Sequence, residues 1–103
     1  MTADLDVTIQ GESMWPTFNE GDVLQMASLQ PEDELAVGDV VLAQHPLKTT
    51  VLLVKRIHRI EDDGRLFLVG DQPDPTASED SHNFGSVPPE NIRARWGGEV
   101  KRA

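Results

Sequence analysis

The chain has 103 residues, no cysteine and a net charge of −9, from eighteen acidic and nine basic residues. An acidic surface disfavours binding to nucleic acids or anionic lipids, which need a basic face, and the absence of cysteine excludes disulfides and a thiolate nucleophile. The acidic N-terminal segment lacks the features of a secretory signal, and no apolar run approaches the ~18 residues of a membrane span. We therefore expect one soluble, cytoplasmic domain over residues 1–103, with one modest core.

Short apolar runs separated by Gly and Pro predict an all-β domain. The expected strands occupy residues 7–10, 23–27, 40–44, 51–60, 66–69 and 92–96. Residues 30–35 are expected to form a single helical turn that begins at Pro31, and residues 62–64, Asp-Asp-Gly, have the composition of a hairpin turn. Residues 70–89 contain four prolines and predict a long loop, which in a small domain usually has a function.

The loop from Gly11 to Thr17, Gly-Glu-Ser-Met-Trp-Pro-Thr, is the first candidate functional segment. Pro16 fixes its own φ and restricts the residue before it, whereas Gly11 allows backbone angles that other residues avoid. Such a loop can direct the Ser13 hydroxyl and one or two backbone N–H groups at one point, as acyl transfer requires. The alternative is an ordinary turn that contains a serine.

Lys55 lies within the longest predicted strand, where alternate residues share a face. Val51, Leu53 and Ile57 would then surround its amine with apolar side chains. Burial disfavours the ammonium form and lowers the pKa, so that a neutral lysine can accept a proton from a serine hydroxyl. Arg56 projects from the other face and does not deprotonate. The alternative is a lysine that extends from an edge strand to solvent.

The remaining ionisable and aromatic residues form no recognisable cofactor site. His45, His58 and His82 are scattered and lack the spacing of metal ligands. We therefore predict no metal and no cofactor. Trp15, beside Ser13, either packs in the core or shapes a substrate groove, whereas core packing is expected for Trp96.

Four segments, in this order, resemble the signal peptidase I family of serine endopeptidases, which use a Ser/Lys dyad. They are Gly11–Thr17, the Gly-Asp-Val-Val-Leu run at 38–42, the Val-Lys-Arg-Ile run at 54–57, and Gly-Asp-Gln at 70–72 followed by Ser-Glu-Asp-Ser-His-Asn-Phe-Gly at 78–85. The resemblance implies a twisted, partly open barrel-like sheet of the signal peptidase/LexA-like type with long loops.

The resemblance also implies roles for individual residues. Ser13 would attack the scissile carbonyl, Lys55 would take its proton, and the Ser13 backbone N–H would serve the oxyanion hole. Ser78 would orient the lysine, and Asp80 would be a structural acid near the site. The residues expected to contact substrate are those around the nucleophile: Gly11, Met14, Trp15 and Pro16.

The chain departs from the family pattern at three places in the last motif. Gln72 replaces the usual Asn, the stretch 73–77 is two residues longer than the common spacing, and His82 stands where the family usually has Arg. An Asp80–Arg ion pair is therefore replaced, at most, by a weaker and pH-dependent Asp80–His82 pair.

Within this family, the length of the chain resembles the small soluble nickel-type superoxide dismutase maturation proteases. The implied function is removal of an N-terminal propeptide from a proprotein, with an extended peptide as the partner and neither nucleic acid nor membrane. One alternative is a non-catalytic interaction or dimerisation module related to self-cleaving repressor domains. Another is the catalytic fragment of a membrane-anchored signal peptidase.

Overall fold

The computed structural model describes residues 4–74, 76 and 79–103. Within them lie six strands and two short helices: β1 (Asp4–Thr8), β2 (Val23–Ser28), β3 (Val40–Gln44), β4 (Leu52–Ile60), β5 (Leu66–Val69), α1 (Ser81–Phe84), the 3-10 helix η1 (Pro89–Asn91) and β6 (Ile92–Lys101). Neither helix in this part of the chain is long and apolar enough to cross a membrane.

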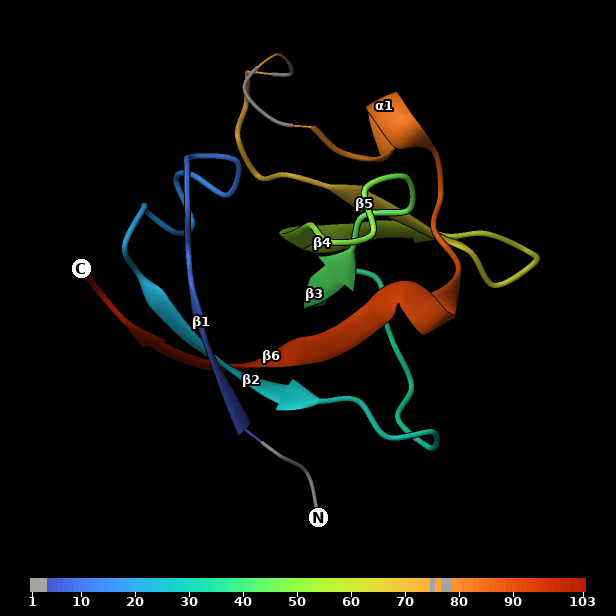
Figure 1. Ribbon diagram of the computed structural model, residues 1–103, viewed down its shortest axis with the longest axis horizontal. Coiled ribbons are helices and arrows are strands. Elements are labelled where there is room, and N and C mark those ends of the chain that lie inside the picture. The colour runs from blue at the N-terminus through green and yellow to red at the C-terminus, as the bar shows by residue number, and fades with distance from the viewer. Residues whose placement is uncertain (1–3, 75, 77–78) are drawn as a thin grey trace.

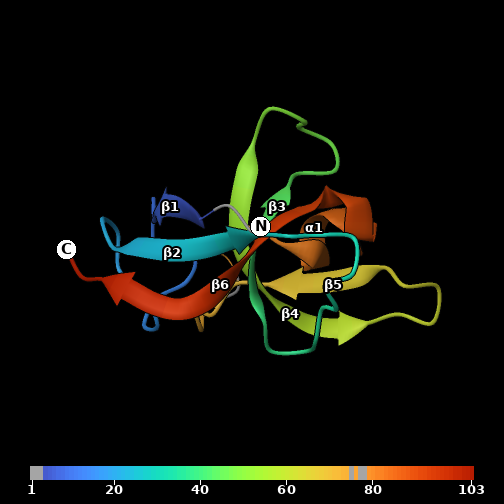
Figure 2. The ribbon, with the colours of Figure 1, turned by 90° about the horizontal axis from the view of Figure 1, so that it is seen from below.

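The strands form one antiparallel sheet in the order β1-β2-β6-β3-β4-β5. Strand β6 joins its two halves, since residues 92–95 pair with β3 and residues 94–101 pair with β2. Figures 1 and 2 show β1, β2 and β6 together in one half and β3, β4 and β5 in the other. The terminal strands β1 and β5 do not pair, so the sheet stays open. The expected all-β, twisted and partly open architecture is confirmed.

Strand β3 is buried on both faces, and this divides the interior into two cores. The first core contains Ile9, Met14, Phe18, Leu24, Met26, Val40, Leu42 and Ala94. The second core contains Val41, Ala43, Ile57, Leu66, Leu68, Val87 and Ile92. Directly opposite residues of an antiparallel pair share a face, so Lys55, which pairs with Val41, lies on the face of the second core.

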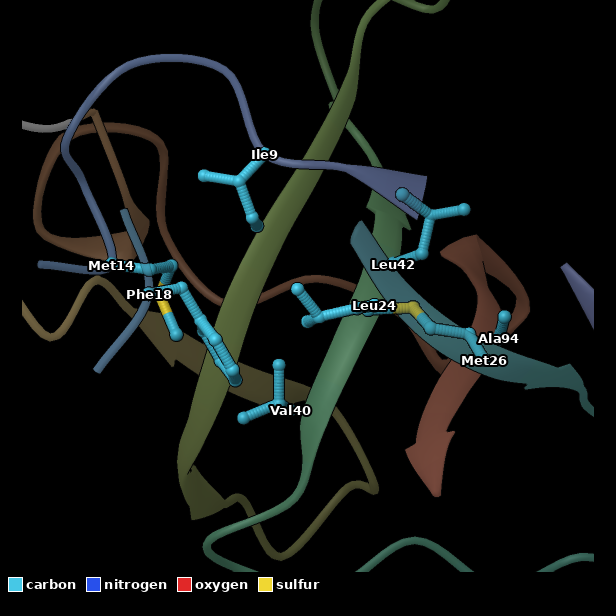
Figure 3. Close-up of a cluster of buried hydrophobic side chains, with 8 residues drawn as sticks. All are labelled: Ile9, Met14, Phe18, Leu24, Met26, Val40, Leu42 and Ala94. Carbon is cyan, nitrogen blue, oxygen red and sulfur yellow. The ribbon is translucent and has the colours of Figure 1, made fainter. Parts of the chain in front are cut away.

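The loop of residues 11–17, here called the serine loop, is anchored in the first core. Met14 and Phe18 are 1% and 0% exposed, and Figure 3 shows both side chains pointing inward toward Leu24 and Val40. The ring of Phe18 also packs edge-on against Trp96, with centroids 5.0 Å apart. Because close packing fixes these side chains, the loop backbone that carries the serine is held at the surface of the core.

The first predicted strand and the predicted helical turn are wrong in detail. Strand β1 covers Asp4–Thr8 rather than residues 7–10, because its exposed acids alternate with half-buried Leu5 and Val7 and the strand pairs with β2. Residues 30–35 form a non-helical turn. There the Asp33 N–H donates to the Gln30 carbonyl at 3.0 Å and the Asp33 carboxylate accepts the Gln30 N–H at 2.9 Å, and this single turn does not continue as a helix.

The C-terminal half contains more regular structure than expected. The long loop over residues 70–89 includes helix α1, which begins with a reciprocal capping box between Asp80 and Asn83. Strand β6 continues to Lys101 rather than ending at Trp96. It pairs with β2 on both sides of Gly97 and Gly98, where the register shifts.

Residues at the C-terminal end hold the serine loop through the buried Asp22. Its carboxylate accepts hydrogen bonds from Asn19 N at 2.8 Å, Arg102 Nη1 at 2.9 Å and Ala103 N at 2.9 Å. Arg102 Nη1 also donates to the Thr17 carbonyl at 2.9 Å. Hydrogen bonds from the backbone N–H groups of Asn19 and Ala103 and from Arg102 keep the pKa of Asp22 below its usual value, against the effect of burial.

Arg102→Ala is expected to lower the free energy of unfolding by about 1 kcal/mol, because two hydrogen bonds from a partly exposed guanidinium are lost. Urea unfolding measures the change. Lys101→Ala is the matched control, since that exposed lysine precedes Arg102 and makes no such contacts in the described structure. Equal stability of the two variants would contradict the role of Arg102.

Candidate active site

Ser13 and Lys55 line one pocket of about 520 Å³. The pocket is bounded by β1 and the residues that follow it, the serine loop, β3 and β4. Its lining consists of residues 5–10, Ser13, Met14, Leu42 and residues 52–55. Most of these side chains are apolar, and the two ionisable ones are Asp6 and Lys55. The fold thus brings together two residues that are 42 positions apart in the sequence.

Two strand edges face this pocket. Strand β1 ends the sheet and pairs only with β2 in the described structure. Strand β5 pairs with residues 56–60 of β4, which leaves residues 52–55 without a neighbour on that side among the described strands. Because unpaired edges present N–H and C=O groups in an extended row, the pocket walls can hydrogen-bond to an extended peptide.

The serine loop is fixed by its own backbone hydrogen bonds. Trp15 N donates to the Glu12 carbonyl at 3.1 Å, and Phe18 N donates to the Met14 carbonyl at 2.9 Å. The Ser13 carbonyl accepts the Gln72 N–H at 3.0 Å, whereas the Ser13 N–H has no acceptor among the described residues. The backbone N–H that the resemblance assigns to the oxyanion hole is therefore available at Ser13.

Lys55 is a buried amine in apolar surroundings. The residue is 3% exposed, and it lies opposite Val41 and two residues before Ile57, both 0% exposed. Burial lowers the pKa of Lys55 below its ordinary 10.5, and the negative charges of Asp80 and Glu79 partly oppose this. Lys55 and Ser13 share the pocket without a hydrogen bond between Nζ and Oγ in the described structure, and hydrogen bonds between catalytic groups often shorten only when substrate binds.

Asp71 connects the serine loop to β4. Its carboxylate accepts a hydrogen bond from Thr17 Oγ1 at 2.6 Å. It also accepts two hydrogen bonds from the Arg56 guanidinium, one from Nε at 2.9 Å and one from Nη2 at 2.7 Å. Burial raises the pKa of Asp71, but the hydrogen bonds from Arg56 and Thr17 outweigh it and keep the pKa below its usual value. Since Arg56 adjoins Lys55, this network ties the two parts of the predicted dyad together.

Asp80 organises the segment beside Lys55. Its carboxylate accepts a hydrogen bond from Gly70 N at 3.3 Å. It also accepts hydrogen bonds from the backbone N and the ring Nδ1 of His82, both at 2.9 Å. Burial raises the pKa of Asp80, and these bonds bring the net pKa below its usual value. The structure thus contains the Asp80–His82 pair that the sequence suggested. Ser78, predicted to orient the lysine, lies outside the described residues.

The four residues predicted to contact substrate are placed differently from one another. Met14 lines the pocket, although most of its side chain belongs to the first core. Trp15 is 44% exposed, and Gly11 and Pro16 are also exposed, but these three are not part of the pocket lining. Gly11 has a φ of 75°, the left-handed region that glycine adopts most easily. A substrate role for these residues stays a prediction.

The sequence did not predict the contacts of three residues: Arg56, Glu79 and His45. Arg56 was considered only as an unsuitable base, and the Gly70-Asp71 motif was the one signal that could have suggested its ion pair. His45 was set aside because it lacked ligand spacing. Its contact with Glu79 joins residues 34 positions apart, which no local pattern reveals.

Comparison with known families matches residues 2–83, most of the chain, to the family described as Peptidase S24-like. The matched region includes Ser13, Lys55 and the Asp71 network. No curated protein sequence matches the chain.

Proposed function

The chain belongs to the Peptidase S24-like family, and from this premise we propose that it is a serine endopeptidase with a catalytic Ser13–Lys55 dyad. One observation supports the proposal most directly: the hydroxyl and a buried amine of lowered pKa line the same pocket. A neutral lysine is a competent base for a serine hydroxyl, which ordinary solvent-exposed lysines are not.

The proposed reaction proceeds through an acyl-enzyme. Neutral Lys55 Nζ accepts the proton of Ser13 Oγ as Oγ bonds to the scissile carbonyl carbon. The resulting oxyanion is stabilised by the Ser13 N–H. The C–N bond then breaks, and the leaving amine takes the proton from Lys55. In the second half, Lys55 takes a proton from water as the water oxygen attacks the ester carbon. Lys55 then returns the proton to Ser13 Oγ as the ester C–O bond breaks, and the acid product leaves.

The proposed substrate is an extended peptide that lies between β1 and the first residues of β4. Both edges can pair with its backbone. Apolar side chains around the pocket, including Leu52 at 55% exposure, favour apolar rather than charged substrate side chains near the cleavage site. An N-terminal propeptide of a proprotein, such as that of a nickel-type superoxide dismutase, is the specific substrate we propose from the family resemblance.

The test is incubation with peptides that span candidate propeptide junctions, followed by mass spectrometry of the products. We expect one defined cleavage, which Ser13→Ala abolishes and the control Ser28→Ala, at the end of β2, retains. Cleavage by Ser13→Ala at the rate of the unmodified protein would reject the dyad.

The family match also supports self-cleavage as a second candidate activity. Cleavage within one molecule is first order and independent of protein concentration, whereas cleavage of a separate proprotein depends on the concentrations of both. The second candidate therefore predicts a self-cleavage rate constant that stays unchanged over a hundredfold range of protein concentration, and a rate constant that rises with concentration would contradict it.

A further inference from the structure

Gln72, in the loop that follows β5, bonds to the serine loop through both its backbone and its side chain. Its backbone N–H donates to the Ser13 carbonyl at 3.0 Å. Its side-chain Nε2 donates to the Glu12 carbonyl at 3.2 Å, although Glu12 and Gln72 are 60 positions apart in the sequence. One residue therefore holds two successive carbonyl groups, one on each side of the Ser13 Cα.

The side-chain amide of Gln72 is oriented by a contact at its other end. Oε1 accepts the backbone N–H of Asp74 at 3.4 Å, and Nε2 is then the group that faces Glu12. This orientation agrees with the chemistry of both partners, because a carbonyl can only accept a hydrogen bond and a backbone N–H can only donate one. The amide of Gln72 therefore presents a donor to the serine loop.

The two contacts restrict both backbone dihedral angles of Ser13. The Glu12–Ser13 peptide is trans, and in a planar trans peptide the C=O and N–H bonds point in opposite directions. A fixed Glu12 carbonyl therefore fixes the direction of the Ser13 N–H, and a fixed Ser13 carbonyl fixes the next peptide plane. With both planes held, the direction of the Ser13 Cα–Cβ bond, which carries the hydroxyl, is set as well.

The Ser13 N–H is directed away from Gln72 and has no acceptor among the described residues. The Glu12 carbonyl of the same peptide accepts a second hydrogen bond, from Trp15 N at 3.1 Å. Hydrogen bonds to a carbonyl polarise its peptide unit, and this strengthens the N–H as a donor. A free and fixed N–H beside the hydroxyl is what an oxyanion hole requires.

We propose that Gln72 is a positioning residue that orients the Ser13 N–H and the Ser13 hydroxyl for the reaction. The proposal rests on the proposed function, in which Ser13 is the nucleophile and its N–H stabilises the oxyanion. Gln72 does not line the pocket formed by the described residues, so it acts through the backbone of residues 12 and 13. Its effect should therefore appear in kcat rather than in KM.

Two substitutions of similar size test the donor at Nε2. Gln72→Glu keeps an acceptor for Asp74 but cannot donate when ionised, and Gln72→Met has neither a donor nor a charge. We expect each variant to lower kcat about tenfold with little change in KM. This is less than the cost of deleting an oxyanion donor, about 10²–10³-fold, because the N–H remains and Trp15 still holds the Glu12 carbonyl.

Gln30→Met is the matched control, since Gln30 is also half-buried but bonds through its backbone and not its side chain among the described residues. It should keep the kcat of the unmodified protein. Urea unfolding shows whether each variant is folded. An unchanged kcat in either Gln72 variant, or a loss confined to KM, would overturn the proposal.

A readout without catalysis uses the mobility of the Ser13 N–H. ¹⁵N relaxation gives the order parameter of individual N–H groups, about 0.85 for a rigid backbone and below about 0.6 for a flexible one. In Gln72→Met, the order parameter of Ser13 should fall toward the flexible range. That of Phe18, whose N–H bonds to the Met14 carbonyl in the same loop, should stay high. An unchanged Ser13 value, or equal falls at Ser13 and Phe18, would reject a specific role of Gln72 at Ser13.

The two readouts separate the failure of this proposal from the failure of the proposed function. If the unmodified protein cleaves no peptide while Ser13 alone gains mobility in Gln72→Met, the proposed function fails and the positioning role of Gln72 stands. If the unmodified protein cleaves peptides but the Gln72 variants change neither kcat nor the Ser13 order parameter, the role of Gln72 alone is rejected.

Discussion

Lys55→Met and Lys55→Arg are each expected to reduce kcat/KM for peptide cleavage on the order of 10³-fold, the usual contribution of a general base. Methionine keeps the apolar packing of the stem but cannot accept a proton, and arginine keeps the charge but does not deprotonate. The two variants together show whether activity depends on the basicity of the Lys55 amine rather than on the shape or the charge of the side chain. The measurement is initial-rate kinetics on the cleaved peptide, with urea unfolding to show that each variant is folded.

Lys101→Met is the matched control for this substitution, because it removes an exposed lysine at the end of β6. It should retain full activity. A Lys55→Arg variant with more than a tenth of the original activity would show that the amine is not the base, whatever the effect of Lys55→Met.

The same amine determines the sign of the pH dependence. Activity requires neutral Lys55, so kcat/KM should rise with pH as the ammonium loses its proton. Burial lowers the pKa of Lys55, and the acidic limb should therefore lie below the ordinary lysine pKa of 10.5. A profile whose acidic limb lies at or above that value would contradict a desolvated base.

Asp71→Ala is expected to reduce kcat/KM on the order of 10²-fold, because the link between the serine loop and β4 is lost and small displacements of reacting groups have effects of this size. Three hydrogen bonds disappear, one from Thr17 and two from Arg56. We expect the loss mainly in kcat, since Asp71 does not line the pocket that would bind the peptide.

Asp74→Ala is the control for Asp71→Ala, since Asp74 belongs to the same loop and its carboxylate bonds only to Thr76 among the described residues. A second readout is stability. The pKa of Asp71 is lowered in the folded state, so its contribution is present above the unfolded pKa of about 3.9 and lost as pH falls through the folded value. The stability difference between the unmodified protein and Asp71→Ala should therefore shrink in acid. Equal kinetics for Asp71→Ala and Asp74→Ala would reject the linking role.

Strands with strong local signals were predicted well from the sequence. Residues 40–44 and 66–69 form strands with the predicted bounds, and 51–60 differs from β4 by one residue. These runs are rich in β-branched or apolar residues between turn signals. The burial of Lys55 and Ile57 also agrees with the predicted strand phase, because alternation follows from backbone geometry alone.

Elements that depend on distant partners were predicted poorly. Strand β1 has two exposed acids and forms because β2 supplies its hydrogen bonds. Strand β6 crosses two glycines for the same reason. Two contacts also join separate parts of the chain: the ion pair between Arg56 and Asp71, and the hydrogen bond between His45 and Glu79. A single sequence does not indicate which of its charged residues will form such contacts.

The sequence by itself determined that the domain is all-β, that a serine lies on a constrained loop, and that a lysine shares a strand face with apolar residues. These properties follow from backbone alternation and from turn residues, which act over a few positions. Only the tertiary structure decided that Ser13 and Lys55 line one pocket and which carboxylates surround the amine. Those relations arise from strand order and packing in two cores, where residues far apart in sequence meet because burial of apolar surface brings them together.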